Sequence, residues 1–361
     1  MRIAVLVPGL APHDAVSNDA LGMTAALRRL GHEVGVFAPH ARGVAEPALA
    51  PDTIENWLRS PDDVVLYHYC VGWDFALALF RRTRARRILR YHNITPPEFF
   101  AGWSPGYEAA CIEGRAQLDA YAALGCELYL GDSPYNIEDF TRRGVDAARC
   151  AVLAPFHEVE QLLSLAPDPR RIPAGKPLLL MIGRISPNKG YLELVDALAA
   201  VVAGGLPDAR LLMVGKLDPN LASYGEALRA RIAERGMQAH VTWLQDANGA
   251  ELRAACARAS ALVMLSRHEG FCVPLVEAMA IGTPVIALAS SAMPSTLGDA
   301  GLLWPEDADA WVIAAAVARV HEDAALRTTL RERGRRRYAD VFAPERLVQG
   351  LATILGEHGF A

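Results

Sequence analysis

Short apolar runs alternate with amphipathic segments along the first half of the chain, and this alternation predicts its architecture. The apolar runs predict strands at residues 3–7, 34–37, 64–69, 88–94, 128–130 and 151–153. Apolar positions at helical spacing predict helices from Ser17 or Asn18 to Gly31 and at residues 73–80, 115–124 and 136–143. Strands that alternate with helices form right-handed βαβ units, so we expect an α/β domain with a parallel sheet.

The second half starts the same pattern again. Its expected strands are residues 178–182, 210–214, 241–244, 262–265 and 285–288, and its expected helices are residues 191–202, 224–234, 250–258, 274–281 and 308–320. The segment 166–177 is rich in proline and keeps neither period, which is typical of a linker. We therefore predict two domains, 1–165 and 178–338, and a late helix at 344–355 that the second sheet does not need.

Composition supports two domains and narrows the class of protein. A chain of 361 residues exceeds what one hydrophobic core usually organises. Its 52% hydrophobic and 21% charged residues are ordinary for an α/β protein, and its formal charge of -5 argues against a mainly nucleic-acid-binding role.

Cysteine spacing and the first residues bear on the compartment. The six cysteines lie far apart, which favours free thiols in a reducing environment. The apolar run 1–7 is too short for a signal-peptide core, and no stretch approaches the roughly 20 apolar residues that cross a bilayer. We expect a cytoplasmic protein.

The run 261–287, ALVMLSRHEGFCVPLVEAMAIGTPVIA, combines a buried strand, a polar turn and a helix start. Glu269 falls in the turn, and Glu277 falls near the start of the helix that Pro274 favours. Parallel sheets bind ligands beyond the carboxyl ends of their strands, where carboxylates can accept hydrogen bonds from sugar hydroxyls. On this stretch alone, a solvated loop residue and a glutamate that complements the helix dipole are an equal alternative.

A second polar loop, GRISPNKG at 183–190, follows the first strand of the same expected sheet. Gly183 allows close approach of a ligand to the backbone, and Arg184 and Lys189 supply the positive charge that a diphosphate leaving group needs. Isolated residues of this kind are more often solvated surface charges. Two complementary loops at one edge of one sheet favour a common site.

The two loops resemble the two signatures of retaining glycosyltransferases of family 4, also called group 1 glycosyltransferases, which have the GT-B fold. The segments GHEVGVFAP, GDSPYN around Asp132 and GDAGLLW near Gly298 are similar to further family landmarks, in the same order. The resemblance implies two doubly wound Rossmann-like domains that face a deep inter-domain cleft. Residues 1–165 would bind the acceptor, residues 178–338 would bind the nucleotide sugar, and residues 339–361 would cross back to the first domain.

The resemblance also implies roles for individual residues. Arg184 and Lys189 would hold the diphosphate, Glu277 the ribose, and Glu269 the transferred sugar beside its reacting carbon. His92 would contact that sugar from the first domain, with a packed or capping histidine as an equal alternative. The implied catalytic residues are His92, Arg184, Lys189 and Glu269, and the implied binding residues also include Gly9, Gly183, Gly270, Phe271, Cys272, Val273 and Glu277. No metal or cofactor is expected, because the cations and helix amides can neutralise the diphosphate.

The implied reaction moves a sugar from a UDP- or GDP-sugar to a saccharide or lipid-linked acceptor, in the synthesis of a surface polysaccharide or glycoconjugate. A sugar-nucleotide epimerase, a phosphorylase or a non-catalytic nucleotide-sugar-binding protein could use the same fold. The chain departs from the family pattern in the loop PGLAPHDAVSND, which lacks paired glycines, at Cys272, where glycine is usual, and at Ser295, where glutamate is common.

Two basic runs and one aromatic cluster each allow more than one interpretation. Residues 81–87 and 331–337 could contact anionic lipid at a membrane surface or be solvated helix ends. The aromatic residues Phe99, Phe100, Trp103 and Tyr107 could line an acceptor cleft or belong to the core or a lid. The oligomeric state stays open.

Overall fold

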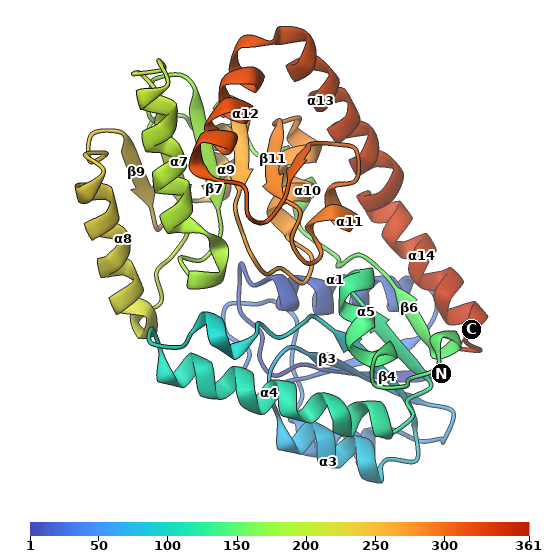
Figure 1. Ribbon diagram of the computed structural model, residues 1–361. Helices are drawn as coiled ribbons and strands as arrows, with labels where there is room; N and C mark the ends of the chain where they lie inside the picture. The colour runs from blue at the N-terminus through green and yellow to red at the C-terminus, as the bar shows by residue number, and fades with distance from the viewer. Residues whose placement is uncertain (361) are drawn as a thin grey trace. The chain divides into compact units, whose positions relative to one another are not determined.

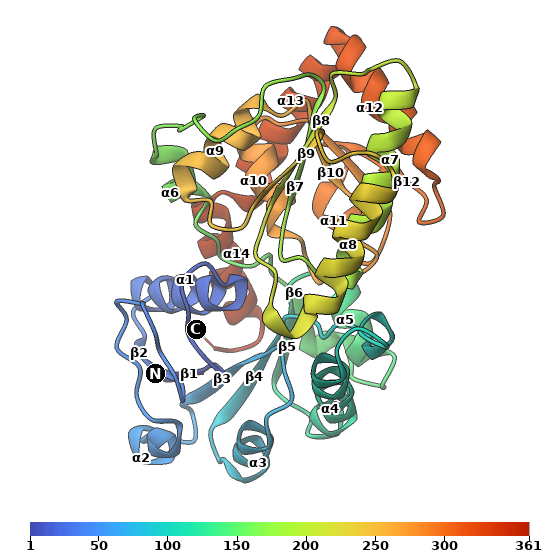
Figure 2. The ribbon, with the colours of Figure 1, turned by 90° about the vertical axis from the view of Figure 1, so that its left-hand side faces the viewer.

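A computed structural model describes residues 1–360 and divides them into two units. The first, here the N-unit, comprises residues 1–97, 108–157 and the residues from Phe342 on. The second, here the C-unit, comprises residues 98–107 and 158–341. Each unit is built around one parallel sheet, which Figures 1 and 2 show from two sides.

The N-unit sheet has the strand order β2-β1-β3-β4-β5-β6, and all its described pairs are parallel. Its strands are β1 (Arg2–Leu6), β2 (Glu33–Phe37), β3 (Val64–Tyr69), β4 (Arg86–Tyr91), β5 (Leu128–Gly131) and β6 (Cys150–Val152). Its helices are α1 (Ala15–Arg29), α2 (Ile54–Trp57), α3 (Asp74–Arg82), α4 (Pro105–Ala123, whose first residues belong to the C-unit), α5 (Pro134–Thr141) and α14 (Pro344–Glu357).

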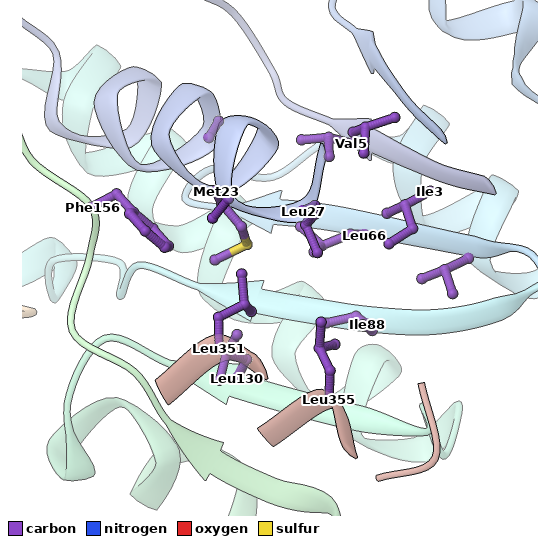
Figure 3. Close-up of a cluster of buried hydrophobic side chains, with 14 of the residues drawn as sticks. Ile3, Val5, Met23, Leu27, Leu66, Ile88, Leu130, Phe156, Leu351 and Leu355 are labelled. Atoms are coloured by element: carbon purple, nitrogen blue, oxygen red, sulfur yellow. The ribbon is translucent and has the colours of Figure 1, made fainter. Parts of the chain in front are cut away.

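Helix α14 supplies part of the N-unit core. Its residues Leu351 and Leu355 are 0% and 2% exposed and belong to one hydrophobic cluster with strand and α1 side chains. Figure 3 shows both leucines directed at the same core as Leu66 of β3 and Ile88 of β4. The late helix therefore packs with the first half of the chain, because its leucines at helical spacing form an apolar stripe.

The C-unit sheet has the order β12-β11-β10-β7-β8-β9, again with parallel pairs. Its strands are β7 (Leu178–Ile182), β8 (Arg210–Val214), β9 (Val241–Leu244), β10 (Ala261–Met264), β11 (Val285–Leu288) and β12 (Leu302–Trp304). Its helices are α6 (Val159–Ser164), α7 (Tyr191–Ala203), α8 (Ala222–Glu234), α9 (Gly249–Arg258), α10 (Val273–Ile281), α11 (Met293–Leu297), α12 (Ala310–Glu322) and α13 (Ala324–Arg337). The chain builds β7 to β9 on one side and then returns to place β10 beside β7. The boundary between β7 and β10 is thus a topological switch point, where open parallel sheets bind ligands.

The structure confirms the predicted strands to within a few residues, but β12 and the helices α2, α6, α11 and α13 were not predicted. Of these helices α13 is the longest. Helix α13 is charged around most of its circumference and buries only Leu330 and Gly334 among its residues. A Cβ at Gly334 would lie 3.3 Å from the Cα of Met279, so the glycine lets α13 approach α10 closely. Periodicity could not detect a helix whose contact rests on one small residue and one leucine.

The segment 166–177, predicted as a linker, packs on the C-unit and is hydrogen bonded to it. Ile172 is only 6% exposed, and the Asp168 amide donates to the Ala250 carbonyl at 3.0 Å. The N-unit boundary falls at His157, ahead of the expected residue 165, because α6 packs against α9 and α10.

Candidate functional site

The two polar loops predicted to act together lie side by side in the C-unit. The loop 183–190 follows β7 and the loop 265–272 follows β10, and these strands are paired neighbours. The Asn188 side chain donates to the His268 carbonyl at 3.0 Å, and the Arg267 amide donates to the Asn188 carbonyl at 2.9 Å. One side-chain and one backbone hydrogen bond therefore fix the loops to each other at the switch point.

Glycines permit the close contacts around the first loop. Gly190 has a φ of 73°, and a Cβ there would lie 2.1 Å from the Leu265 carbonyl oxygen. Gly183 has a φ of 148°, and its carbonyl oxygen would lie 1.8 Å from a Cβ added at Gly215. The Tyr191 hydroxyl donates to the same carbonyl at 2.6 Å. Gly183 is thus held by the protein's own backbone contacts, and Gly215 and Tyr191 are supporting residues that the sequence did not reveal.

Lys189 and Glu269 form a direct ion pair across the two loops. The Lys189 Nζ lies 2.7 Å and 2.8 Å from the two carboxylate oxygens of Glu269. The side chains are 18% and 8% exposed, so the pair is largely withdrawn from water. The cation expected to meet a diphosphate and the carboxylate expected to meet a sugar therefore reach the same point of the fold.

The turn into α10 is held by side chains from the next loop. The Ser291 hydroxyl accepts from the Glu269 amide at 2.8 Å, and the Thr296 hydroxyl donates to the Phe271 carbonyl at 2.7 Å. Cys272, the residue before α10, has a φ of 78° in the left-handed region. Glycine adopts this conformation without strain, which gives a physical reason for the family preference at that position. Gly270 and Val273 flank this turn at half-buried positions.

Glu277 of α10 has a carboxyl oxygen sealed from solvent. Its Oε2 atom has no hydrogen-bond partner among the described residues, and burial raises the pKa of the carboxyl to about 7. Buried acceptors are normally paired. An unpaired one beside a switch point is consistent with hydroxyl donors that a ligand would bring.

Arg184, in the first loop, has an exposed side chain. It lies near a segment that was not expected to pack on the C-unit. Residues 98–107, here the aromatic strap, belong to the C-unit although they follow β4 in the sequence. The Tyr107 hydroxyl donates to Asp218 at 2.9 Å, and burial and that bond raise the pKa of Tyr107 against the influence of Arg184. Arg184 therefore has an acidic neighbour in Asp218.

The rest of the aromatic strap packs on the same unit. The Trp103 ring meets Tyr224 of α8 edge to face at 5.2 Å, and the Ser223 hydroxyl donates to the Trp103 carbonyl at 3.0 Å. Phe99 lies 6.1 Å from the His268 ring, next to Glu269 in sequence. These contacts support the core or lid interpretation of the aromatic cluster.

His92 in the N-unit was expected at the end of the strand 88–94 and lies just after β4, which ends at Tyr91. Both its ring nitrogens are engaged within that unit. Its Nδ1 is 3.0 Å from Asp132 Oδ2, and its Nε2 is 2.9 Å from His68 Nδ1. The two imidazoles stack with centroids 5.1 Å apart, and the His92 side chain is 5% exposed. The following residue, Asn93, has a φ of 69° and donates to Asn136 Oδ1 at 3.0 Å.

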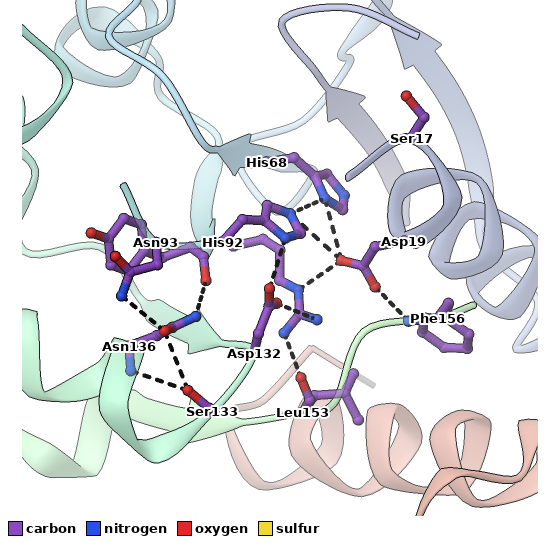
Figure 4. Close-up of polar contacts among 12 residues, drawn as sticks. Ser17, Asp19, His68, His92, Asn93, Asp132, Ser133, Asn136, Leu153 and Phe156 are labelled. Atoms are coloured by element: carbon purple, nitrogen blue, oxygen red, sulfur yellow. Dashed lines mark hydrogen bonds and ion pairs between the residues drawn. The ribbon is translucent and has the colours of Figure 1, made fainter. Parts of the chain in front are cut away.

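These residues belong to a buried group, here the Asp–His cluster, that Figure 4 shows in full. Its members are Asp19 of α1, His68 of β3, Arg90 of β4, His92, and Asp132 after β5. Arg90 bridges the two carboxylates, at 2.9 Å to Asp19 and 2.8 Å to Asp132. Burial alone would raise the pKa of Asp19, but Arg90 and both histidines hold it below its ordinary value.

Sequence reasoning found only His92 and the landmark around Asp132 in this cluster. A histidine and an arginine inside the apolar strands β3 and β4 were the available signal for His68 and Arg90, because buried strands rarely carry such groups without partners. Asp19 lies in a segment predicted as an amphipathic helix, and no feature of the neighbouring sequence indicated that its carboxylate is buried.

Asp19, His68 and His92 also place one potential ligand atom each within 4.8 Å of the others. The protein's own bonds account for that proximity, since the histidines are hydrogen bonded and Arg90 binds Asp19. A divalent ion there would sit next to the Arg90 guanidinium and leave the cluster with a net positive charge. The arrangement fits a hydrogen-bonded cluster better than a metal centre.

Gly9, predicted to approach a substrate, lies in the loop after β1. An added Cβ there would meet only the His40 carbonyl oxygen, at 3.9 Å, so packing does not explain the glycine. Its role in substrate binding stays a prediction.

The basic run 81–87 is largely used inside the N-unit. Arg82 pairs with Glu55, Arg87 pairs with Glu127, and Arg86 lies over the Phe360 ring at 3.6 Å from its centroid. In the second run, Arg335 and Arg337 donate to backbone carbonyls of the C-unit. These contacts support the structural interpretation of both runs. No helix within residues 1–360 is long and apolar enough to cross a membrane.

Comparison with known proteins gives the family. The family model described as glycosyl transferases group 1 matches residues 166–337, which include both loops of the C-unit. A GDP-mannose:cellobiosyl-diphosphopolyprenol alpha-mannosyltransferase from Xanthomonas oryzae is 37% identical over 261 residues, covering 71% of this chain and 60% of the relative. Residues 166–337 of this chain therefore match the group 1 glycosyltransferase family.

Other similarities extend over the rest of the chain. A phosphatidyl-myo-inositol mannosyltransferase from Mycolicibacterium smegmatis is 28% identical, over 91% of the chain and 86% of the relative. The HepE protein of Anabaena, crystallised with UDP, superposes with a TM-score of 0.76 at 18% identity, over 99% of this chain and 100% of that one. This likeness confirms the predicted GT-B fold. Two other curated relatives are matched over only 39% and 37% of their own length.

Proposed function

We propose that the protein is a retaining glycosyltransferase that transfers a sugar from a UDP- or GDP-sugar to a saccharide or lipid-linked acceptor. The observation that carries the proposal is the Lys189–Glu269 ion pair at the switch point of the C-unit sheet, with the unpaired Oε2 of Glu277 on the helix that follows. The name of the Xanthomonas relative supports a nucleotide sugar and a polyprenol-linked acceptor. Synthesis of surface polysaccharide or glycoconjugate at the inner side of the membrane is the setting that fits such an acceptor.

In this proposal, Arg184 and Lys189 bind the donor's diphosphate and stabilise the negative charge that grows as the sugar leaves. The backbone amides of Gly270, Phe271, Cys272 and Val273, at the start of α10, add hydrogen-bond donors to the same anion. A diphosphate that takes over Lys189 releases the Glu269 carboxylate to accept hydrogen bonds from sugar hydroxyls. Glu277 accepts from the ribose hydroxyls.

Retention is proposed to follow from attack on the face that the diphosphate leaves. The acceptor oxygen then bonds to the anomeric carbon, and its proton passes to the departing phosphate oxygen. A covalent glycosyl-enzyme is the second route to retention. Neither route calls on a metal or a cofactor for charge, because Arg184 and Lys189 supply two positive groups at the diphosphate.

Thermal unfolding against a panel of UDP-, GDP- and ADP-sugars tests donor binding. A ligand that binds only the folded state raises the midpoint, by about 2.7 kcal/mol of stability at 100 times its dissociation constant. We expect one donor class to act and Lys189→Ala to remove the effect. Lys176→Ala is the matched control, since Lys176 is an exposed lysine just before β7, at the opposite end of the strand from the site. A panel without any shift contradicts the proposal.

Product analysis separates the transferase from the other activities of the fold. Transfer gives a glycoside with the donor's anomeric configuration and a free nucleoside diphosphate. Formation of sugar phosphate from inorganic phosphate identifies a phosphorylase, and a changed donor sugar without acceptor identifies an epimerase. A binding protein would bind the donor without any turnover, and its function in cells would be unaffected by Glu269→Ala.

A further inference from the structure

The Asp–His cluster carries an unbalanced buried charge when both its imidazoles are neutral. Two carboxylates, Asp19 and Asp132, face one guanidinium, Arg90, and all three side chains are at most 6% exposed. The Cys70 thiol, which interacts with Asp132, stays neutral because burial raises its pKa to about 12. An excess negative charge in a buried site is costly, and one positive charge is needed to cancel it.

A single proton on the two imidazoles meets this need better than a metal ion does. One proton brings the formal charge of the cluster to zero, whereas a divalent ion brings it to plus one beside Arg90. The hydrogen-bond distances also fit a doubly protonated His92, with Asp132 at 3.0 Å from one ring nitrogen and His68 at 2.9 Å from the other. Burial lowers the pKa of His68 well below its ordinary value, which makes His68 the neutral acceptor of the pair.

We propose that Asp132 and His68 are positioning residues that hold His92 as an imidazolium, while Asp19 and Arg90 set the charge around it. The inference rests on the proposed function and on the expectation, implied by the family resemblance, that His92 contacts the transferred sugar. Because both ring nitrogens are used inside the N-unit, His92 has no proton to hand to a substrate. Its contribution is a fixed positive charge and a rigid His92–Asn93 turn, which Asn136 also holds in its left-handed conformation.

The protonation state can be observed directly by NMR of the full chain labelled with ¹⁵N-histidine, with His92→Gln used to assign the signal. At pH 8, where a histidine of ordinary pKa, about 6.5, is neutral, we expect both ring nitrogens of His92 to carry protons. Asp132→Asn keeps the shape and a hydrogen-bond acceptor but removes one negative charge, so His92 should become neutral at that pH. Asp139→Asn is the matched control, because Asp139 binds the Tyr91 hydroxyl and lies outside the cluster. A neutral His92 in the unmodified chain, or an unchanged signal in Asp132→Asn, overturns the proposal.

Kinetics and metal titration complete the test. With a donor that turns over, Asp132→Asn should lower kcat by about 10- to 100-fold, because the fixed charge of His92 is lost and its turn is displaced, and should change KM little. An unchanged kcat overturns the positioning role. If calorimetry shows uptake of one Zn²⁺ per chain and His68→Gln abolishes it, the cluster binds a metal in place of the proton. That result overturns the inference. If no nucleotide sugar binds, the proposed function fails, and the NMR signal alone then decides the charge of His92.

Discussion

At the residue scale, the left-handed backbone of Cys272 sets conformational strain against the packing of a buried side chain. The conformation costs about 1–3 kcal/mol for a residue other than glycine. Cys272 is buried at 6% exposure, so its side chain returns part of that cost through packing. This packing helps to explain how a cysteine can stand where the family pattern has glycine.

A β-branched residue at this position should shift the balance. Cys272→Val is expected to destabilise the protein by about 1–3 kcal/mol more than Cys272→Gly does, because valine tolerates the left-handed region poorly. Urea unfolding of both variants measures the difference. The same replacement at Cys256, buried inside helix α9, is the control for added volume without the unusual backbone. Equal losses at the two positions would show that packing, and not the backbone, limits Cys272.

If Glu277 binds the ribose as proposed, donor binding should depend on pH. The pKa of its free carboxyl is about 7 because of burial, and ribose hydroxyls that donate to the carboxylate would lower it in the complex. Binding then favours the deprotonated form and releases protons. Donor affinity should therefore rise between about pH 6 and pH 8 and level off above the pKa of the free carboxyl.

Calorimetric titration of a nucleotide sugar at several pH values measures this dependence. Glu277→Gln should bind more weakly above pH 7 and with an affinity that no longer changes over this range. An unmodified chain whose affinity is flat from pH 6 to pH 8 would mean that Glu277 does not meet the donor.

The ion pair of Lys189 and Glu269 suggests opposite effects of two similar substitutions. Glu269→Gln removes the partner of Lys189 and frees the ammonium for phosphate, so the affinity for a free nucleoside diphosphate, which lacks the sugar, should rise or stay equal while turnover falls. Lys189→Met should weaken both. Isothermal titration with UDP and GDP, paired with turnover assays, separates the two roles. A loss of nucleoside diphosphate affinity in Glu269→Gln would contradict the exchange of partners.

At the element scale, α14 stabilises the N-unit through its apolar face. Leu351→Ala should cost about 2–5 kcal/mol of unfolding free energy, the range for a buried leucine in a packed core. Chemical denaturation measures the loss of unfolding free energy, and hydrogen exchange shows which elements are affected. Reduced protection is expected in β1, β3 and α1, whose residues share that core, and Ala352→Gly on the same helix controls for a change of helix propensity alone. Loss of protection confined to α14 would show that the helix is only loosely attached.

Elements with a strong local pattern were predictable, and those fixed by distant contacts were not. The strands β7 and β10 and their loops follow from apolar runs that end in polar, glycine-containing turns. Helix α13 lacks an apolar stripe, so its contact with Met279 through Gly334 was invisible to periodicity. The aromatic strap was recognised as a cluster, but its attachment to α8 depends on Ser223 and Tyr224, far along the chain.

At the scale of the whole molecule, the same limit applies to the candidate site. Residue types and sheet order placed Arg184, Lys189, Glu269 and Glu277 at one edge, because the carboxyl ends of parallel strands open on one side. The Asp–His cluster draws its members from α1, β3, β4 and the turn after β5. Its charge balance therefore emerges only when the sheet is assembled, and the sequence alone marks little more than His92.

The placement of α14 also has a consequence for synthesis on the ribosome. The C-unit, apart from the aromatic strap, is one continuous stretch, 158–341, whereas the N-unit core needs Leu347, Leu351 and Leu355 from beyond it. Domains generally fold as units in the order in which they emerge. The part of the N-unit core that α14 covers therefore stays exposed until the second half has been made, and we expect chaperone dependence to be greatest at that stage of synthesis.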